Sequence, residues 1–217
     1  MRTTRGDMTD RYRIRTGTRS ARAVVAVVLT AGVVAGCSSA SNSGSKDSAT
    51  TADATALAAR LTQIDEAINS WQSSPDLAAA RVFAETARNL VVGPDGPYYG
   101  DADGDGTIEG ASERGLLPGV DGQSGIATEA FGVCVTRDVL GGSWADPQAR
   151  WAELDDKITA WSPKNNPFPT LASHPQRIVG WATLAIDAAT LEEALEYAGH
   201  AHLHIDVAQQ AVTACSA

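Results

Sequence analysis

Apolar residues recur at three- and four-residue spacing through most of the chain beyond residue 51, and no stretch alternates apolar and polar residues as a strand does. Spacing of this kind places apolar side chains on one face of an α-helix, and that face must be buried against other helices. Residues 52–72 are predicted as the first helix, because their apolar residues step by three or four: Leu57, Leu61, Ile64, Ile68 and Trp71. The predicted fold is an all-α bundle of four to six helices.

Capping residues, glycines and prolines divide the rest of this pattern into further helices. The signals are Ser74-Pro75-Asp76 and Gly93-Pro94 around the second helix, Asp146-Pro147 and Ser162-Pro163 around the fourth, and Ser173 to Pro175 before the fifth. The third helix is predicted over residues 126–140. Thr190 and Glu193 have the spacing of a capping box, so they start the C-terminal helix or restart the fifth one.

The first 36 residues differ in charge from the rest of the chain. They hold seven Arg and two Asp, whereas residues 37–217 hold ten basic and 24 acidic residues. An Arg-rich start, an uncharged apolar run over 23–35 and small residues before Cys37 predict a secretory signal peptide at residues 1–36. The acidic body has no electrostatic reason to bind a phosphate backbone, so we expect no nucleic-acid partner.

The residues before Cys37 also suggest how the protein is anchored. Val34-Ala-Gly-Cys37 resembles the lipobox of bacterial lipoproteins, in which the cysteine is acylated and becomes the mature N-terminus. The resemblance implies a lipid anchor at Cys37 and a location on the extracytoplasmic face of the cell membrane. Residues 37–51 are rich in serine and predict a flexible tether, which leaves 52–217 as the helical domain.

Export also determines how the other two cysteines are interpreted. Cys134 and Cys215 form an even pair in an oxidising compartment, and they are predicted to form a disulfide. The alternative is two buried thiols that pack as small apolar groups.

Residues 93–125 form a connection too long and too rich in glycine to be a plain turn. Within it, Asp101, Asp103 and Asp105 alternate with small residues, and Gly106 follows at once. Alternating carboxylates with a glycine for the sharp bend suit a hard cation that prefers oxygen ligands. This segment resembles the calcium loop of EF-hands and dockerin-type repeats.

The resemblance implies a calcium loop at about residues 99–113. Its ligands would be Asp101, Asp103, Asp105, the carbonyl of Thr107, and a closing acid that is Glu109, Glu113 or Asp121. The closing choice stays open because the twelfth position, which closes an EF-hand, is Ser112. Ile108 would pack the loop against the core. The alternative to a calcium site is a solvated acidic turn.

Three of the four histidines lie in the C-terminal helix. His200 and His204 are four residues apart on one face, and with Glu196 they would offer Zn²⁺, Cu²⁺ or iron a partial ligand set. His202 falls on the apolar side of the same helix and is predicted to be buried. The alternative for the other two is an ordinary polar helix face.

No sequence motif marks an enzyme, since no nucleophile elbow, phosphate-binding loop or zinc-protease motif is present, and no catalytic residue is predicted. Residues 84–93 resemble a stretch of uncharacterised exported helical proteins of bacteria, which implies no activity. The predicted function is that of a membrane-anchored lipoprotein with a calcium-stabilised helical module that binds a protein or small molecule. A lipoprotein that binds or handles a transition metal is the alternative.

Overall fold

The computed structural model describes residues 44–129 and 132–215, all within one compact unit. These residues form helices and no β-strand, so the predicted all-α class is confirmed. The elements are α1 (Gly44–Gln72), α2 (Leu77–Val92), α3 (Ile126–Glu129), α4 (Val133–Asp138), α5 (Pro147–Ala160), the 3-10 helix η1 (Phe168–Thr170), α6 (His174–Ile186) and α7 (Leu191–Cys215).

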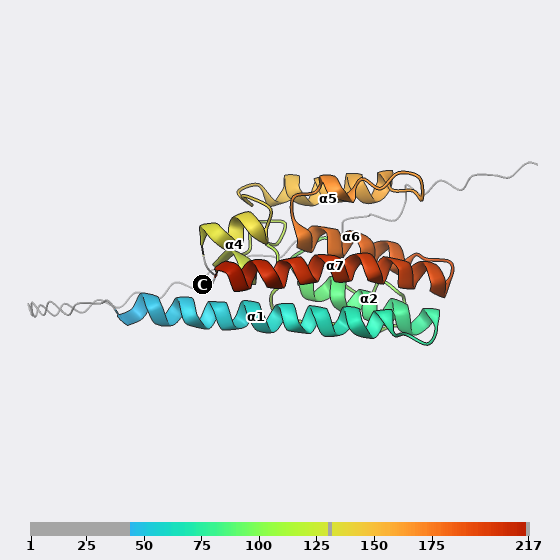
Figure 1. Ribbon diagram of the computed structural model, residues 1–217, viewed down its shortest axis with the longest axis horizontal. Coiled ribbons are helices and arrows are strands. Elements are labelled where there is room, and N and C mark those ends of the chain that lie inside the picture. Colours follow the sequence, from blue (N-terminus) through green and yellow to red (C-terminus); the bar gives the residue numbers. More distant parts are fainter. Residues whose placement is uncertain (1–43, 130–131, 216–217) are drawn as a thin grey trace, which may run out of the picture. The chain divides into compact units, whose positions relative to one another are not determined.

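Four helices form the bundle. α1 packs against α2 and α7, and α6 packs against the same two helices. The four helices therefore form a closed ring in the order α1, α2, α6, α7. Figure 1 shows α1 and α7 side by side, with α5 on the side of the bundle remote from α1. The apolar residues predicted for the first helix are all buried, as their spacing requires. α5 packs on α6 and α4 packs on α7, outside the ring.

The helix starts are set by side-chain caps, with one correction to the sequence analysis. Asp76, and not Ser74, caps α2, because its Oδ1 accepts the N–H of Ala79 at 2.8 Å. Ser74 instead donates its hydroxyl to the Ser70 carbonyl at the end of α1. Asp146 caps α5 as expected, accepting the N–H of Ala149 at 3.0 Å.

Two other boundaries differ from those predicted. α1 begins at Gly44, within the predicted tether, whose first residues lie outside the described part of the chain. Once its packed turns exist, each residue added to a helix gains a backbone hydrogen bond, so polar residues can extend it. The helix predicted over 126–140 is two short helices, and Gly132 before the second has a φ of 56° that a helix cannot contain.

The last two helices are separate. Thr190 Oγ1 accepts the N–H of Glu193 at 3.2 Å, and Glu193 Oε2 accepts the N–H of Ala189 at 3.1 Å. These reciprocal bonds start α7 afresh after α6 has ended at Ile186.

The long connection over 93–125 leaves the end of α2 and returns to it. Leu116 and Leu117 are buried, and their N–H groups donate to carbonyls in the last turn of α2. At Gly93, where φ is 70°, a Cβ would lie 2.1 Å from the nitrogen of Gly115, so only glycine allows this approach. The acidic segment is therefore the middle of a loop whose two ends meet on one helix.

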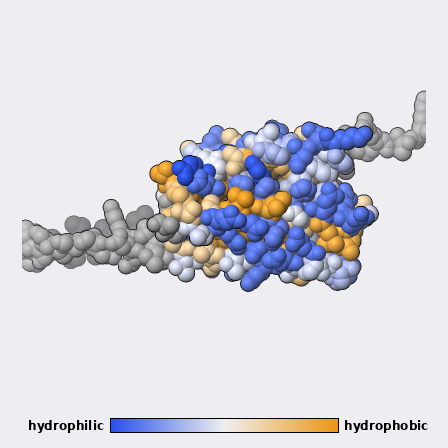
Figure 2. All heavy atoms as spheres, in the orientation of Figure 1, coloured by the Kyte–Doolittle hydropathy of each residue, from blue (hydrophilic) through white to orange (hydrophobic). Residues whose placement is uncertain are grey.

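The face seen in Figure 2 is mostly hydrophilic, with small hydrophobic patches between polar areas. On α7, Leu203 and Val207 are 60% and 39% exposed. Among the described residues, no helix combines the length and hydropathy needed to span a bilayer.

Candidate functional site

Each of the three aspartates predicted as calcium ligands is held by backbone N–H groups of its own loop. Asp101 accepts from Gly104 at 2.8 Å and Gly106 at 3.0 Å, Asp103 from Asp105 at 3.1 Å, and Asp105 from Thr107 at 2.7 Å. Gly104 and Gly106 have φ angles of 79° and 95°, the left-handed conformation that favours glycine. The alternation of Asp and Gly therefore produces a tight turn with its carboxylates fixed.

Glu85 of α2, which the sequence analysis missed, is the acceptor beneath this turn. Its side chain is fully buried. One carboxylate oxygen accepts the N–H groups of Ala102 and Asp103 at 2.5 and 3.1 Å, and the other accepts the N–H of Glu109 at 2.9 Å. A buried carboxylate is stable only when donors surround it, and here the donors are the backbone of the acidic loop.

Asn89, one turn further along α2, holds the two ends of the same loop. Its amide donates to the carbonyls of Gly100 at 3.2 Å and Glu109 at 2.7 Å, and its Oδ1 accepts the Gly100 N–H at 3.1 Å. At Gly110, a Cβ would lie 2.4 Å from the carbonyl oxygen of Thr86, so the backbone of the loop touches the helix there. α2 thus fixes the loop at both ends and at its centre.

The carboxylates are close enough to repel one another. Ligand oxygens of Glu85, Asp101 and Asp103 all lie within 4.8 Å of each other. Partial burial raises the pKa of Asp103, and the charges of Asp105, Glu85 and Asp101 raise it further, although the N–H of Asp105 opposes the rise. A cation among these oxygens would relieve that repulsion.

A positive charge already compensates Glu85 from the side of the helix. Burial lowers the pKa of Arg88, and the neighbouring charge of Glu85 opposes that shift most strongly. Arg88 is 6% exposed and lies within electrostatic reach of Asp103 as well. The helix thus brings both an anion and its counter-ion to the loop.

The other predicted calcium ligands lie outside the group of three oxygens. Glu109 is tied to α2 through its backbone, and Glu113 is exposed. The prediction for Ile108 is wrong, because its side chain is 45% exposed. The loop is attached to the helix by Glu85 and Asn89, so no apolar anchor is needed.

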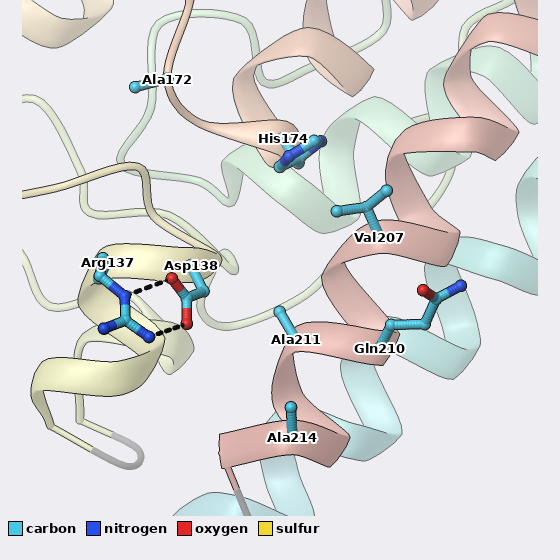
Figure 3. A pocket seen from close by; sticks show the side chains of 8 residues that line it. All are labelled: Arg137, Asp138, Ala172, His174, Val207, Gln210, Ala211 and Ala214. Carbon is cyan, nitrogen blue, oxygen red and sulfur yellow. Dashed lines mark hydrogen bonds and ion pairs between the residues drawn. The ribbon is translucent and has the colours of Figure 1, made fainter.

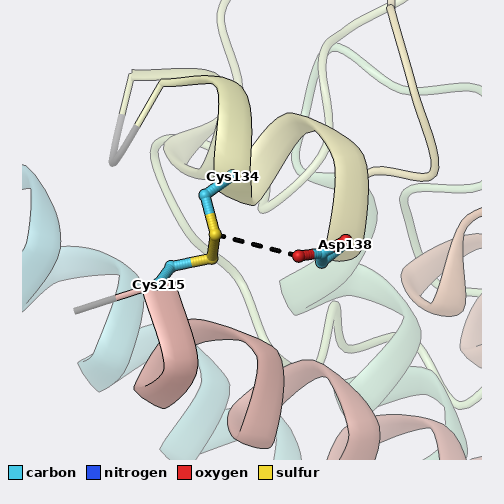
Figure 4. A group of neighbouring side chains, drawn as sticks. All are labelled: Cys134, Asp138 and Cys215. Atoms are coloured by element: carbon cyan, nitrogen blue, oxygen red, sulfur yellow. Dashed lines mark hydrogen bonds between the residues drawn. A yellow bond between two sulfur atoms is a disulfide. The ribbon is translucent and has the colours of Figure 1, made fainter. Parts of the chain in front are cut away.

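The predicted disulfide is present. Cys134 Sγ lies 2.05 Å from Cys215 Sγ and joins α4 to the last residue of α7 (Figure 4). Asp138 Oδ2 lies 3.8 Å from Cys134 Sγ, but a disulfide sulfur carries no proton, so this is a contact and not a hydrogen bond. These three residues therefore do not offer a metal site.

The two histidines of the alternative metal site have different neighbours. His204 Nδ1 lies 3.2 Å from His174 Nδ1 on α6, whereas His200 stacks on Trp181 with 4.3 Å between ring centroids. Among the described residues, Glu196 is in no group of three metal-binding side chains with either histidine. Burial lowers the pKa of His204 to about 4, and that of His174 is lowered for the same reason.

His202 is not buried as predicted, since its side chain is 32% exposed. It lies at the edge of the contact between α1 and α7, where Nε2 is 3.7 Å from Asp65 Oδ1 and Nδ1 is 3.6 Å from Asp206 Oδ2. Two carboxylates give a histidine at this edge polar partners that the apolar core would lack.

A groove of about 510 Å³ runs between α4 and α7 (Figure 3). Val207 and Gln210 line its α7 side, and His174 lies at one end. On the α4 side, Arg137 and Asp138 pair with each other at 2.5 Å. The groove therefore offers a ligand one ion pair and little other unsatisfied charge.

Comparison with known proteins gives no relative for this molecule. No protein-family model, curated protein or solved structure matches the chain. Its function must therefore be inferred from its own residues.

Proposed function

We propose that the protein is a lipid-anchored extracytoplasmic lipoprotein whose helical body is a binding module braced by calcium. The lipobox-like sequence ending at Cys37 supports the anchor, and the Cys134–Cys215 disulfide fits an oxidising compartment outside the cytoplasm. The groove between α4 and α7 is a candidate surface for the partner.

The observation that supports calcium most strongly is the attachment of the acidic loop to buried polar side chains of α2. Glu85 and Asn89 hold the backbone of the loop, so Asp101, Asp103 and Asp105 are in place before an ion arrives. Ordering a loop is part of the free-energy cost of binding, and an ordered loop avoids it.

Thermal unfolding tests this proposal. For Kd values of about 10⁻⁴–10⁻³ M, usual for extracellular calcium modules, about 5 mM Ca²⁺ would stabilise the folded state by about 1–2 kcal/mol. That corresponds to a rise in Tm of about 2–8 °C over the value in EDTA. Equal melting curves in EDTA and Ca²⁺ would exclude the calcium brace.

Two matched variants make the test specific. Asp103→Ala with Asp105→Ala should abolish the rise in Tm, because both carboxylates are removed from the loop. Glu66→Ala with Asp156→Ala removes the same charge from exposed positions on α1 and α5 and should leave the rise intact. If both double variants respond to Ca²⁺ as the wild type does, the ion binds elsewhere.

The anchor has its own test. Cys37→Ser should abolish acyl labelling and release the protein from the membrane fraction, because the lipid is carried by the thiol. Cys134→Ser is the matched control and should still be labelled. Continued acylation of Cys37→Ser would contradict the lipoprotein assignment.

A second candidate function, transition-metal binding, is favoured by the contact of His174 with His204. Two Nδ1 atoms 3.2 Å apart, on imidazoles whose pKa values are lowered, are available as neutral ligands. Calorimetry with Zn²⁺ or Cu²⁺ should give an isotherm that His204→Ala removes. Loss of the isotherm in His174→Ala as well would place the site at the His174–His204 contact, and loss in His200→Ala would place it at the His200–His204 pair predicted from the sequence. A flat wild-type titration at neutral pH would eliminate this candidate, and an isotherm lost only in His202→Ala would move the site to Asp65 and Asp206.

A further inference from the structure

A second cavity, of about 300 Å³, lies between α6, the start of α7 and the turn that follows α5. Its walls include three aromatic rings, those of Trp161, Trp181 and Tyr197. The ring planes of Trp161 and Tyr197 meet at 90° with centroids 5.4 Å apart, and Trp181 lies 28° from the plane of Tyr197. These rings support one another, but Trp181 and Tyr197 are only 3% and 4% exposed, and His200 stacks on Trp181 at 4.3 Å. The half-buried Trp161 is therefore the ring that is most accessible to a ligand.

The fixed charges of this cavity are negative. Glu193 and Glu196 are among its lining residues, no Lys or Arg is, and the other ionisable side chain on its wall is His200, which stacks on Trp181. Glu193 is fixed in place, because its Oε1 accepts the hydroxyl of Tyr197 at 2.9 Å and its Oε2 accepts the Ala189 N–H. Burial raises the pKa of Tyr197, and Glu193 raises it further, so the phenol remains a neutral donor.

The cavity is also built on rigid parts of the fold. Phe168 of η1 is fully buried and meets Trp181 edge to face at 4.7 Å. A Cβ on Gly180 would lie 2.7 Å from the Phe168 ring, so the two pack as closely as glycine allows. Ser162 and Asn165 exchange both backbone hydrogen bonds across the turn that carries Trp161. A ligand would therefore meet a preformed pocket.

We propose that this cavity binds a small organic cation, an alkylammonium or quaternary ammonium group. The faces of aromatic rings attract such cations, whose methyl groups also pack on the rings, and the two carboxylates balance the positive charge. A calcium or magnesium ion would use the two carboxylates but would gain nothing from the aromatic walls. A neutral sugar could stack on the tryptophans and donate its hydroxyl groups to the carboxylates, but it would leave their negative charge uncompensated.

The carboxylates also favour a free cation over a phosphate-linked head group, because Glu196 is exposed at the rim and would repel the phosphate. This inference goes beyond the proposed function and is independent of calcium and of the anchor. None of its residues belongs to the acidic loop, to α2 or to the disulfide.

Calorimetry on the full chain in a polyoxyethylene detergent, at neutral pH with EDTA present, tests the proposal. The cationic probes are choline and tetramethylammonium, and the neutral probe of the same shape as choline is 3,3-dimethylbutan-1-ol. Phosphocholine represents a lipid head group, and N-acetylglucosamine represents a sugar. We expect both cations to bind, choline more tightly than its neutral isostere and more tightly than phosphocholine.

Variants then identify the residues responsible. Trp161→Ala should weaken choline binding about three- to thirtyfold, the range for one cation–π contact, whereas Trp161→Phe should retain most of it. Glu196→Gln, at an exposed position that cannot harm the fold, should weaken binding about two- to fourfold. Glu192→Gln removes the same charge from a neighbouring position that does not line the cavity and should bind as the wild type does.

Several results would overturn the proposal. The first is that neither cation gives heat up to about 50 mM, which is far above the millimolar affinities of weak ligands. The second is equal affinity for choline and its neutral isostere, and the third is binding of the sugar alone. Equal weakening by Glu196→Gln and Glu192→Gln would show that only the general negative charge of the surface attracts the cation. Tighter binding of phosphocholine would refute the preference for a free cation.

Discussion

Replacing Glu85 by Gln tests whether the buried carboxylate organises the acidic loop. Glutamine has the same shape, but one of its two polar atoms is a donor. In the better of its two orientations, the amide NH₂ faces the N–H of Glu109 and the Nδ2 of Asn89, which lies 3.4 Å from the replaced oxygen in the wild type and keeps its other acceptors. The remaining oxygen still accepts from Ala102 and Asp103. One backbone N–H then loses its acceptor, and the other two bonds lose the assistance of the negative charge.

The size of the effect follows from these three bonds. A buried donor without a partner costs about 1–3 kcal/mol, and two bonds to a neutral acceptor are each weaker by about 1 kcal/mol than bonds to a charged one. Relief of the desolvation of a fully buried charge offsets part of this sum. We expect Glu85→Gln to lower the free energy of unfolding by about 2–4 kcal/mol, or Tm by about 5–15 °C.

The measurement is thermal and urea unfolding in EDTA, so that no calcium contributes, together with amide hydrogen exchange. The amides of Ala102, Asp103 and Glu109 should exchange faster in Glu85→Gln. Glu66→Gln, at an exposed position of α1, is the control and should change the stability by less than about 0.5 kcal/mol. If Glu85→Gln behaves like this control, and the three amides keep their protection, Glu85 does not hold the loop.

Two further predictions concern stability. Reduction of the Cys134–Cys215 disulfide, which spans 81 residues, should cost about 4–5 kcal/mol by loop-closure entropy, and Cys134→Ala with Cys215→Ala should be insensitive to reductant in urea unfolding. The pKa of His204 is about 4 in the folded state, below its ordinary value of about 6.5. Because the folded state keeps the imidazole neutral, the contribution of His204 to the free energy of unfolding is present above pH 6.5 and is lost as the pH falls toward 4. At about pH 5 this loss should reach about 1–2 kcal/mol for a partly exposed group. The urea midpoint of His204→Asn should therefore fall less between pH 7 and pH 5 than that of the wild type. An equal fall would show that His204 does not cause the pH dependence.

The bundle could be predicted because helix periodicity is a local property of the sequence. The stripe over Leu57–Trp71 and the caps at Asp146 and Thr190 depend only on neighbours three or four residues away. The helix predicted across 126–140 failed because glycine carries no local signal for the sign of φ. Only the fold decides that Gly132 takes a φ of 56°.

The site was predictable only in part, since its two halves lie far apart in the sequence. The spacing of the aspartates predicts the loop. The residues that hold it, Glu85 and Asn89, lie 16 and 12 residues before Asp101 on a helix. No local signal singles them out, because Glu85 and Asn89 share one side of α2 with Arg81 and Arg88, and that side has the pattern of an ordinary polar helix face. Only the loop that folds back over this side makes them buried. Nothing local brings His174 to His204 or Trp161 to Trp181, because these contacts join different elements of the bundle.

The position of the acidic loop explains why we expect calcium to brace the fold without switching it. A sensor loop lies between two helices and changes the angle between them when the ion binds. Here Gly93 and Gly110 separate the loop from any flanking helix, and α2 lies beneath it, attached through Glu85 and Asn89. α2 is also packed between α1 and α6, so an ion in the loop pulls on a helix that cannot rotate freely. Calcium should therefore raise Tm while the helix content and the exposed apolar surface stay constant.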